Sequence, residues 1–156
     1  MKFIIFSIFL GSIFPSSIFA EAITQQTALS FGTIALRDNA SSHQMSISFD
    51  GSIIADPAFI IITQGNPAEF LLSGFTANTL ININILVPST TTMLAGATDP
   101  SSSQFTIDNH HSFAPIVTTN LLGEATINIG ARLTTSGIGF YKDSMYIAPM
   151  TISVSY

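Results

Sequence analysis

The stretch that decides the fold is Tyr146-Ile147-Ala148-Pro149-Met150-Thr151-Ile152-Ser153-Val154-Ser155-Tyr156, because its side chains alternate between two sets. One set is largely apolar: Tyr146, Ala148, Met150, Ile152, Val154 and Tyr156. The intervening set is more polar and includes Thr151, Ser153 and Ser155. In an extended chain, successive side chains point to opposite faces, so this stretch predicts a strand with one buried face.

The same alternation recurs along the chain and predicts further strands. It runs from Met45 to Phe49, from Ile81 to Val87 and from Ile127 to Leu133, and Asp50-Gly51 after the first of these is a hairpin signal. No window shows the spacing of an amphipathic helix. The sequence therefore predicts an all-β fold, an antiparallel β-sandwich of about 8–10 strands.

Other segments give weaker expectations about how these strands connect. Glu69 to Phe75 and Leu80 to Val87 are expected to pair around Thr76-Ala77-Asn78. Ala58 to Thr63 is nearly all apolar, which fits either a strand buried on both faces or a bulged one. Pro88 to Ser103 is the longest connection and is expected to be an exposed loop.

The N-terminus has the features of a secretory signal peptide. Lys2 precedes an apolar run from Phe3 to Phe14, and a small residue, Ala20, closes the segment. We expect cleavage after residue 20, a short loose leader over 21–28 and one β-sandwich domain over 29–156. The expected location is outside the cytoplasm: secreted, in the periplasm, or on the outer surface or a fimbria of a bacterium, with no stable membrane span after cleavage.

Composition narrows the classes of partner and chemistry. The chain carries four Lys and Arg against nine Asp and Glu, a formal net charge of −5, and no cysteine. Without Lys2 the mature chain has three basic and nine acidic residues, a net charge of −6. This disfavours nucleic acid as a partner, because phosphate binding needs clustered Lys and Arg. With no cysteine and therefore no disulfide, an exported chain is expected to depend for its stability on its core, on a metal or on association with neighbours.

The spacing of the polar residues gives little support for a metal-binding or catalytic site. As metal ligands on a strand, His110 and His111 would point to opposite faces. Asp108 and His43 could be added to such a metal site, but we interpret the pair as part of a solvated loop. Asp99-Pro100-Ser101-Ser102-Ser103 lacks the repeated acidic spacing of a calcium loop. No serine lies in a nucleophile-elbow context. We therefore expect no catalytic residue, no metal and no cofactor.

Aromatic side chains offer one alternative, a ligand platform. Phe105, Phe113, Phe140 and Tyr141 could form an exposed surface for a sugar or a peptide, although core packing is the default for phenylalanine. Phe140 and Tyr141 stand beside Gly137 and Gly139 and are the candidate loop contacts.

Four motifs, in this order, resemble those of a bacterial family of secreted, pilin-like β-sandwich proteins classed as a domain of unknown function. The motifs are Leu29-Ser30-Phe31-Gly32-Thr33-Ile34, Ala68-Glu69-Phe70-Leu71-Leu72-Ser73-Gly74, Asn128-Ile129-Gly130-Ala131-Arg132-Leu133, and Tyr146 with Thr151 to Tyr156. The resemblance runs over Leu29 to Tyr156. The family is similar in character to the spore-coat-U and archaic chaperone–usher fimbrial subunits.

This resemblance implies an immunoglobulin-like sandwich at the cell surface and no catalytic residues. It predicts a non-enzymatic structural or interaction protein that assembles by β-strand addition, with other subunits of a surface fibre and a periplasmic chaperone as partners. The alternative is an adhesin-like module that binds carbohydrate or protein through its loops. The candidate strand-addition edges are Leu29, Phe31, Ile34, Met150, Ile152, Val154 and Tyr156.

Overall fold

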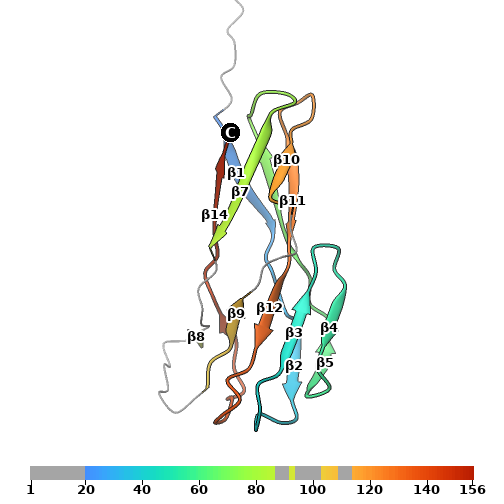
Figure 1. The fold of residues 1–156 in the computed structure, drawn as a ribbon, viewed down its shortest axis with the longest axis vertical. Coiled ribbons are helices and arrows are strands. Elements are labelled where there is room, and N and C mark those ends of the chain that lie inside the picture. The colour runs from blue at the N-terminus through green and yellow to red at the C-terminus, as the bar shows by residue number, and fades with distance from the viewer. Residues whose placement is uncertain (1–19, 87–91, 94–102, 109–113) are drawn as a thin grey trace, which may run out of the picture.

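A computed structural model describes residues 20–86, 92–93, 103–108 and 114–156, and within these residues the chain forms strands and no helix (Figure 1). The strands are β1 (Ala22–Thr27), β2 (Thr33–Leu36), β3 (Gln44–Ile47), β4 (Ile53–Ala55), β5 (Phe59–Thr63), β6 (Ala68–Ser73), β7 (Leu80–Leu86), β8 (Thr92–Met93), β9 (Thr106–Asp108), β10 (Ile116–Thr118), β11 (Ala125–Ile129), β12 (Ala131–Thr134), β13 (Tyr146–Ile147) and β14 (Thr151–Ser155). All their pairings are antiparallel.

The upper part of the elongated molecule consists of two three-stranded sheets. Their orders are β1-β6-β11 and β10-β7-β14. Inward side chains of β6, β7 and β11 form one buried cluster, which we call the upper core: Ala68, Phe70, Leu72, Phe75, Ile81, Ile83, Ile85, Ile127 and Ile129. Two sheets that share one apolar filling form a sandwich, as the alternation predicts.

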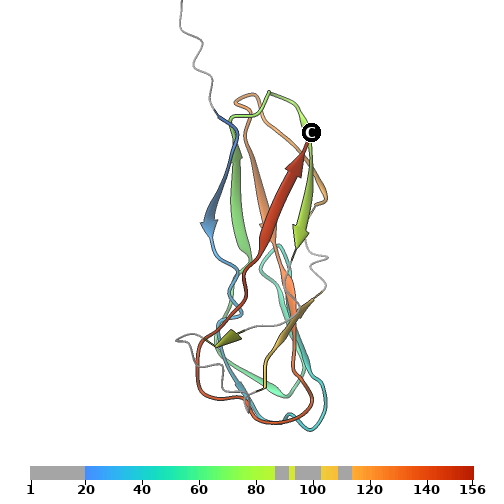
Figure 2. The ribbon, with the colours of Figure 1, turned by 90° about the vertical axis from the view of Figure 1, so that its left-hand side faces the viewer.

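The lower part repeats this arrangement with shorter strands. A four-stranded sheet, β4-β3-β12-β9, lies with the pairs β2-β5 and β13-β8 (Figure 2). Their inward side chains form the lower core: Met45, Phe59, Phe105, Ile107, Ala131 and Leu133. Leu29 packs against both cores, so the two parts share their apolar contacts at the waist of the molecule.

Long strands run through both parts and change partners at the waist. The clearest case is Gly130, which separates β11 from β12. β11 pairs with β6, whereas β12 pairs with β3, so the chain passes from one sheet to the other at this glycine. A Cβ at Gly130 would collide with the carbonyl oxygen of Ile47. A glycine is required there because the two backbones touch.

The structure confirms the all-β sandwich and most of the alternation. Ile152 and Val154 are half-buried while Thr151, Ser153 and Ser155 are exposed, as expected for the last strand. The three isoleucines of β7 also face inward. The strands outnumber the expected eight to ten because breaks such as Gly130 divide long extended segments in two.

Several local expectations are wrong. β6 and β7 do not pair with each other; they lie in opposite sheets and face each other across the upper core. The leader is not loose, because β1 pairs with β6. Of the two alternatives for residues 58–63, the bulged strand is confirmed, because β5 is bulged against β2; Ile60, Ile61 and Ile62 are exposed, so burial on both faces is wrong.

The expected signal peptide lies outside the described residues except for Ala20, as does most of the 88–103 loop. The described part of the chain contains no helix of the length and apolarity that a membrane span requires.

Candidate functional site

The first candidate site is the outer edge of β14, whose main-chain groups lack a strand partner among the described residues. Ile83 on β7 donates its N–H to the carbonyl oxygen of Pro115 at 2.8 Å, so its main-chain groups face β10. Val154 lies opposite Ile83, and its own N–H and C=O therefore point away from β7. Ile152, two residues earlier, has the same orientation. The edge thus presents donors and acceptors in the spacing of a strand.

The core behind this edge is less covered than elsewhere. Met150, Ile152 and Val154 pack against the upper core but are only partly buried, whereas Ile81 and Ile129 inside it are 0% exposed. Leu29, which follows β1, is also partly buried against the same cluster. Apolar side chains at the β14 edge therefore still expose surface that an added strand would cover.

β1 occupies the neighbouring edge in an unusual way. All six of its residues are exposed, including Ile23, although the strand pairs with β6 along Ala22 to Thr27, with a register shift between Gln25 and Thr27. The strand is therefore held mainly by its main-chain hydrogen bonds, with little side-chain burial. β1 and β14 run along the same side of the molecule (Figures 1 and 2).

The ends of these two strands meet at Tyr156. Its ring packs edge-on against Phe75 with centroids 5.3 Å apart, while the side chain remains 65% exposed. The Glu21 carboxylate, which precedes β1, lies beside the Tyr156 hydroxyl, and this interaction raises the pKa of Tyr156 above its usual value. A carboxylate beside a phenol favours the neutral form of the phenol.

The remaining edge residues lie outside these two strands, since Phe31 stands between β1 and β2 and Ile34 belongs to β2. Phe31 and Ile34 pack against the lower core together with Tyr146 and Ala148. The structure thus distributes the seven candidate edge residues over two cores and does not gather them into one pocket.

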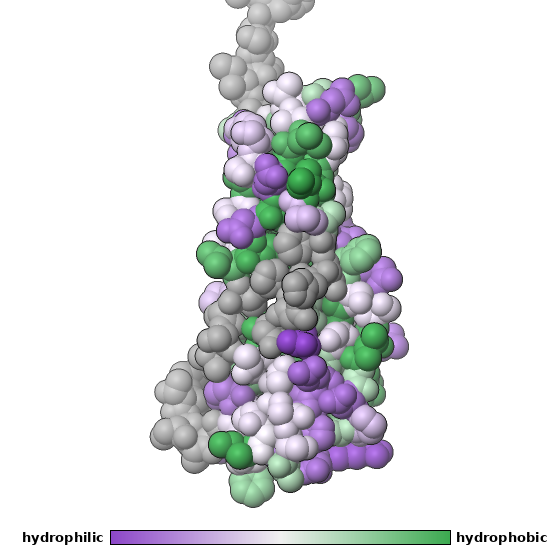
Figure 3. Space-filling model, in the orientation of Figure 1, coloured by the Kyte–Doolittle hydropathy of each residue, from purple (hydrophilic) through white to green (hydrophobic). Residues whose placement is uncertain are grey.

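The outer face of the β10-β7-β14 sheet carries a small apolar patch towards its other edge, β10. Leu80 on β7 and Ile116 on β10 are both exposed and are diagonal neighbours in the register. Figure 3 shows apolar side chains gathered over these upper strands. The patch spans β10 and β7, so it is not part of the β14 edge.

The two candidate loop residues have opposite environments. Tyr141 stacks on Phe105 at 4.2 Å; its hydroxyl donates to the Gln104 carbonyl at 3.1 Å and accepts from the Ser136 N–H at 2.8 Å. Tyr141 therefore holds the loop in place. Phe140 is 86% exposed and is the loop aromatic that a ligand can reach.

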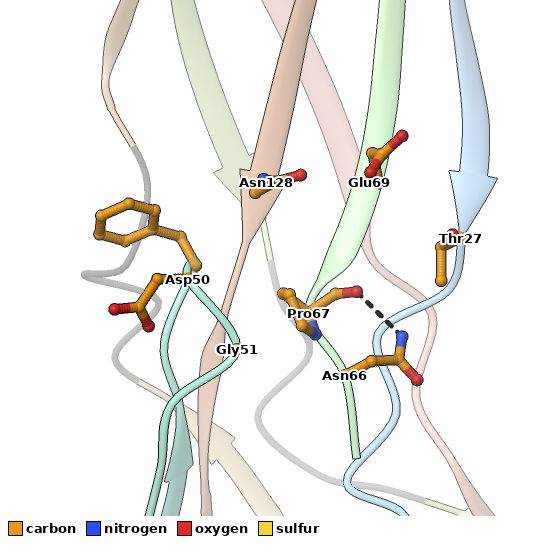
Figure 4. A pocket seen from close by; sticks show the side chains of 8 residues that line it. Thr27, Asp50, Gly51, Asn66, Pro67, Glu69 and Asn128 are labelled. Atoms are coloured by element: carbon orange, nitrogen blue, oxygen red, sulfur yellow. Dashed lines mark hydrogen bonds between the residues drawn. The ribbon is translucent and has the colours of Figure 1, made fainter.

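A third site, a polar hollow at the waist with a volume of about 340 Å³, was not predicted from the sequence. Its lining residues come from four segments: Thr27, Phe49, Asp50, Gly51, Asn66, Pro67, Glu69 and Asn128. Figure 4 shows Asn128 and Glu69 side by side on neighbouring strands, between the hairpin of Asp50 and Gly51 and the end of β1 at Thr27. One sequence signal could have found it: Phe49 continues the alternation of a buried strand but directly precedes a turn signal.

Other candidate residues lie outside the described part of the chain: His110, His111, Phe113 and residues 99–102. His43 is described, and its ring lies 3.8 Å from the Asp56 carboxylate. The described residues contain no cluster of three or more His, Cys, Asp or Glu side chains that could hold a metal ion.

Fold and sites together define an all-β, antiparallel, sandwich-like domain with an open sheet edge and a shallow polar hollow. A model of the domain of unknown function DUF4402 matches residues 22–156. The chain belongs to this family. No curated protein and no solved structure matches the chain.

Proposed function

We propose that this chain is an exported, non-enzymatic structural or interaction protein, a pilin-like or surface-coat subunit that assembles by β-strand addition. The observation that carries the proposal is the β14 edge, where the main-chain groups of Ile152 and Val154 face outward beside a partly covered core. An extended segment laid along β14 would pair with these groups, and its alternate side chains would cover the exposed apolar surface.

The resemblance to spore-coat-U and archaic chaperone–usher subunits supports the same role. In that role the sandwich is immunoglobulin-like, the mature chain acts in the periplasm, on the outer surface or in a fimbria, and its partners are other subunits and a periplasmic chaperone. β1 is a candidate donor segment, because a strand with six exposed side chains loses little packing when it leaves its own sheet.

A pair of substitutions at one position tests the proposal. Val154→Pro removes the outward N–H, which an added strand needs, without removing a bond to β7. Val154→Ala is the matched control, since it also shortens the side chain, at a cost of at most about 1.6 kcal/mol, but keeps the N–H. Size-exclusion chromatography with light scattering and negative-stain electron microscopy would follow assembly of residues 21–156.

We expect wild type and the alanine variant to form oligomers or fibres as concentration rises, and the proline variant to remain monomeric. A wild-type chain that stays monomeric at every concentration, alone and with a co-encoded chaperone, would refute assembly. Equal assembly of the proline variant would exclude the β14 edge.

A second candidate function is that of an adhesin-like module that binds carbohydrate or protein through its loops. Phe140 favours it, because an aromatic ring that is 86% exposed on a loop fixed by Tyr141 is suited to stacking on a ligand. A glycan array with wild type and Phe140→Ala tests this role. Binding that is lost in the variant would support it.

A further inference from the structure

The polar hollow at the waist has a floor made from three adjacent strands. Thr27 on β1 and Asn128 on β11 both lie opposite Glu69 on β6, so the three residues form one row across the sheet. All three are exposed, on the outer face. Neighbouring strands lie about 4.8 Å apart, so the row spans roughly 10 Å. The floor therefore offers a hydroxyl, a carboxylate and an amide in fixed positions.

The wall of the hollow is the tight turn between β3 and β4. The Gly51 N–H donates to the Ser48 carbonyl at 3.0 Å, and the Asp50 carboxylate accepts from both the N–H and the hydroxyl of Ser52, at 3.0 and 2.7 Å. Gly51 adopts a φ of 83°, which few other residues tolerate. A Cβ at Gly51 would lie 3.9 Å from the Pro67 ring, so the turn lies close to Pro67.

Phe49 is the anomalous side chain of this wall. Met45 and Ile47 on the same strand are 0% exposed, and the alternation would bury Phe49 with them. The strand ends at Ile47, however, and the turn leaves Phe49 53% exposed, lining the hollow. A large aromatic ring in solvent beside convergent polar groups is the usual composition of a small-molecule site.

The charges of the hollow restrict the ligand. Among the described residues that line it, Asp50 and Glu69 are ionisable and none is Lys, Arg or His. The hydrogen bonds from Ser52 lower the pKa of Asp50, so it is a carboxylate at neutral pH. Two acidic groups without a cation disfavour phosphate, sulfate and acidic sugars. Hydroxyl groups suit this lining, because they donate to carboxylates and also accept from the Asn128 amide.

We propose that this hollow binds one neutral sugar residue, with its C–H face on Phe49 and its hydroxyls on Glu69, Asn128 and Asp50. A volume of about 340 Å³ is at the small end of ligand sites, which run from about 300 to 1,000 Å³, and so suits a single terminal residue of a glycan. The site is open to solvent, so the rest of the glycan can extend away. The proposal does not depend on assembly through β14.

A glycan array probed with residues 21–156, followed by titration calorimetry with the methyl glycoside of the terminal sugar of the best hit, tests the site. Phe49→Ala is expected to weaken binding roughly tenfold and Asn128→Ala about 3–10-fold. Leu121→Ala, which removes an exposed apolar side chain outside both candidate binding sites, is the control and should bind as wild type does. Melting curves would check that each variant folds.

Salt distinguishes a neutral sugar from a cationic ligand. Affinity for a neutral sugar should be unchanged between about 0.1 M and 1 M salt, where the screening length falls from about 10 to 3 Å. Array binding confined to amine-bearing ligands, or lost at high salt, would overturn the proposal in favour of a cationic peptide. A blank array at high protein concentration would overturn it, as would loss of binding in Phe140→Ala but not in Phe49→Ala or Asn128→Ala. Oligomer size, measured separately, reports on the assembly proposal.

Discussion

Replacing Thr119 with valine is expected to destabilise the domain through two hydrogen bonds at one buried hydroxyl. Thr119 is 2% exposed, accepts from the Thr79 N–H at 2.9 Å and donates to the Thr76 carbonyl at 2.7 Å. It thereby holds the arch by which the chain crosses from β6 to β7. Valine has the same shape without the hydroxyl, so the substitution isolates these two bonds.

The structure sets the magnitude. A buried polar group left without a partner costs about 1–3 kcal/mol. Thr79 is half-buried and would bear this cost, whereas Thr76 is exposed and its carbonyl can turn to water. We therefore expect Thr119→Val to lower the free energy of unfolding by about 2 kcal/mol, and the melting temperature by about 4–8 °C for a chain of this length.

The assay is urea unfolding followed by far-ultraviolet circular dichroism. The dependence of the free energy of unfolding on urea concentration is taken as equal in all variants. Thr119→Ser is the matched control: it keeps the hydroxyl and loses one methyl group, worth about 0.8 kcal/mol. The reasoning is refuted if the valine variant is within about 0.5 kcal/mol of wild type. It is also refuted if serine proves the more damaging of the two substitutions.

Two further predictions concern the waist and the strand ends. Gly130→Ala should destabilise by about 2 kcal/mol or more, because its Cβ meets the Ile47 carbonyl and one strand must shift; a melting curve matching wild type would contradict the close approach. Glu21→Gln should lower the pKa of Tyr156 towards 10.0, measured by absorbance of the phenolate during alkaline titration. In wild type the raised pKa means that the unfolded chain loses this proton first, so the contact contributes stability below about pH 10 that is lost as pH rises further; an unchanged titration in the variant would refute the contact.

Side-chain alternation predicted which faces are buried, since a period of two depends on local sequence alone. Ile152 and Val154 face inward for this reason, as do the isoleucines of β7. Strand partners were a different matter. A short link from Phe75 to Leu80 favoured a hairpin, yet a hairpin and a crossing between sheets bury the same faces. The choice depends on a distant residue, Thr119, which bonds to the link from 40 and 43 positions away.

The polar hollow at the waist could not be predicted from the sequence, because it too depends on contacts between residues far apart in the chain. Thr27, Glu69 and Asn128 are each ordinary outward residues of a strand, and only the register brings them into one row. Phe49 carried the one readable signal, because the Asp50-Gly51 turn ends the strand before the alternation can bury it. The edge residues were predictable as edges, but their division between an upper and a lower core was not.

The two proposals meet at β1. Thr27 is its last residue and forms one end of the row that floors the hollow, while the rest of the strand is exposed and held to β6 mainly through the main chain. A ligand that contacts Thr27 is bound fully only while β1 lies on β6. Binding of such a ligand and docking of β1 on β6 are linked equilibria. Docked β1 raises the affinity for the ligand by some factor, and the bound ligand favours docking by the same factor. If β1 is the donor strand of assembly, binding of a ligand that reaches Thr27 and release of that strand oppose each other.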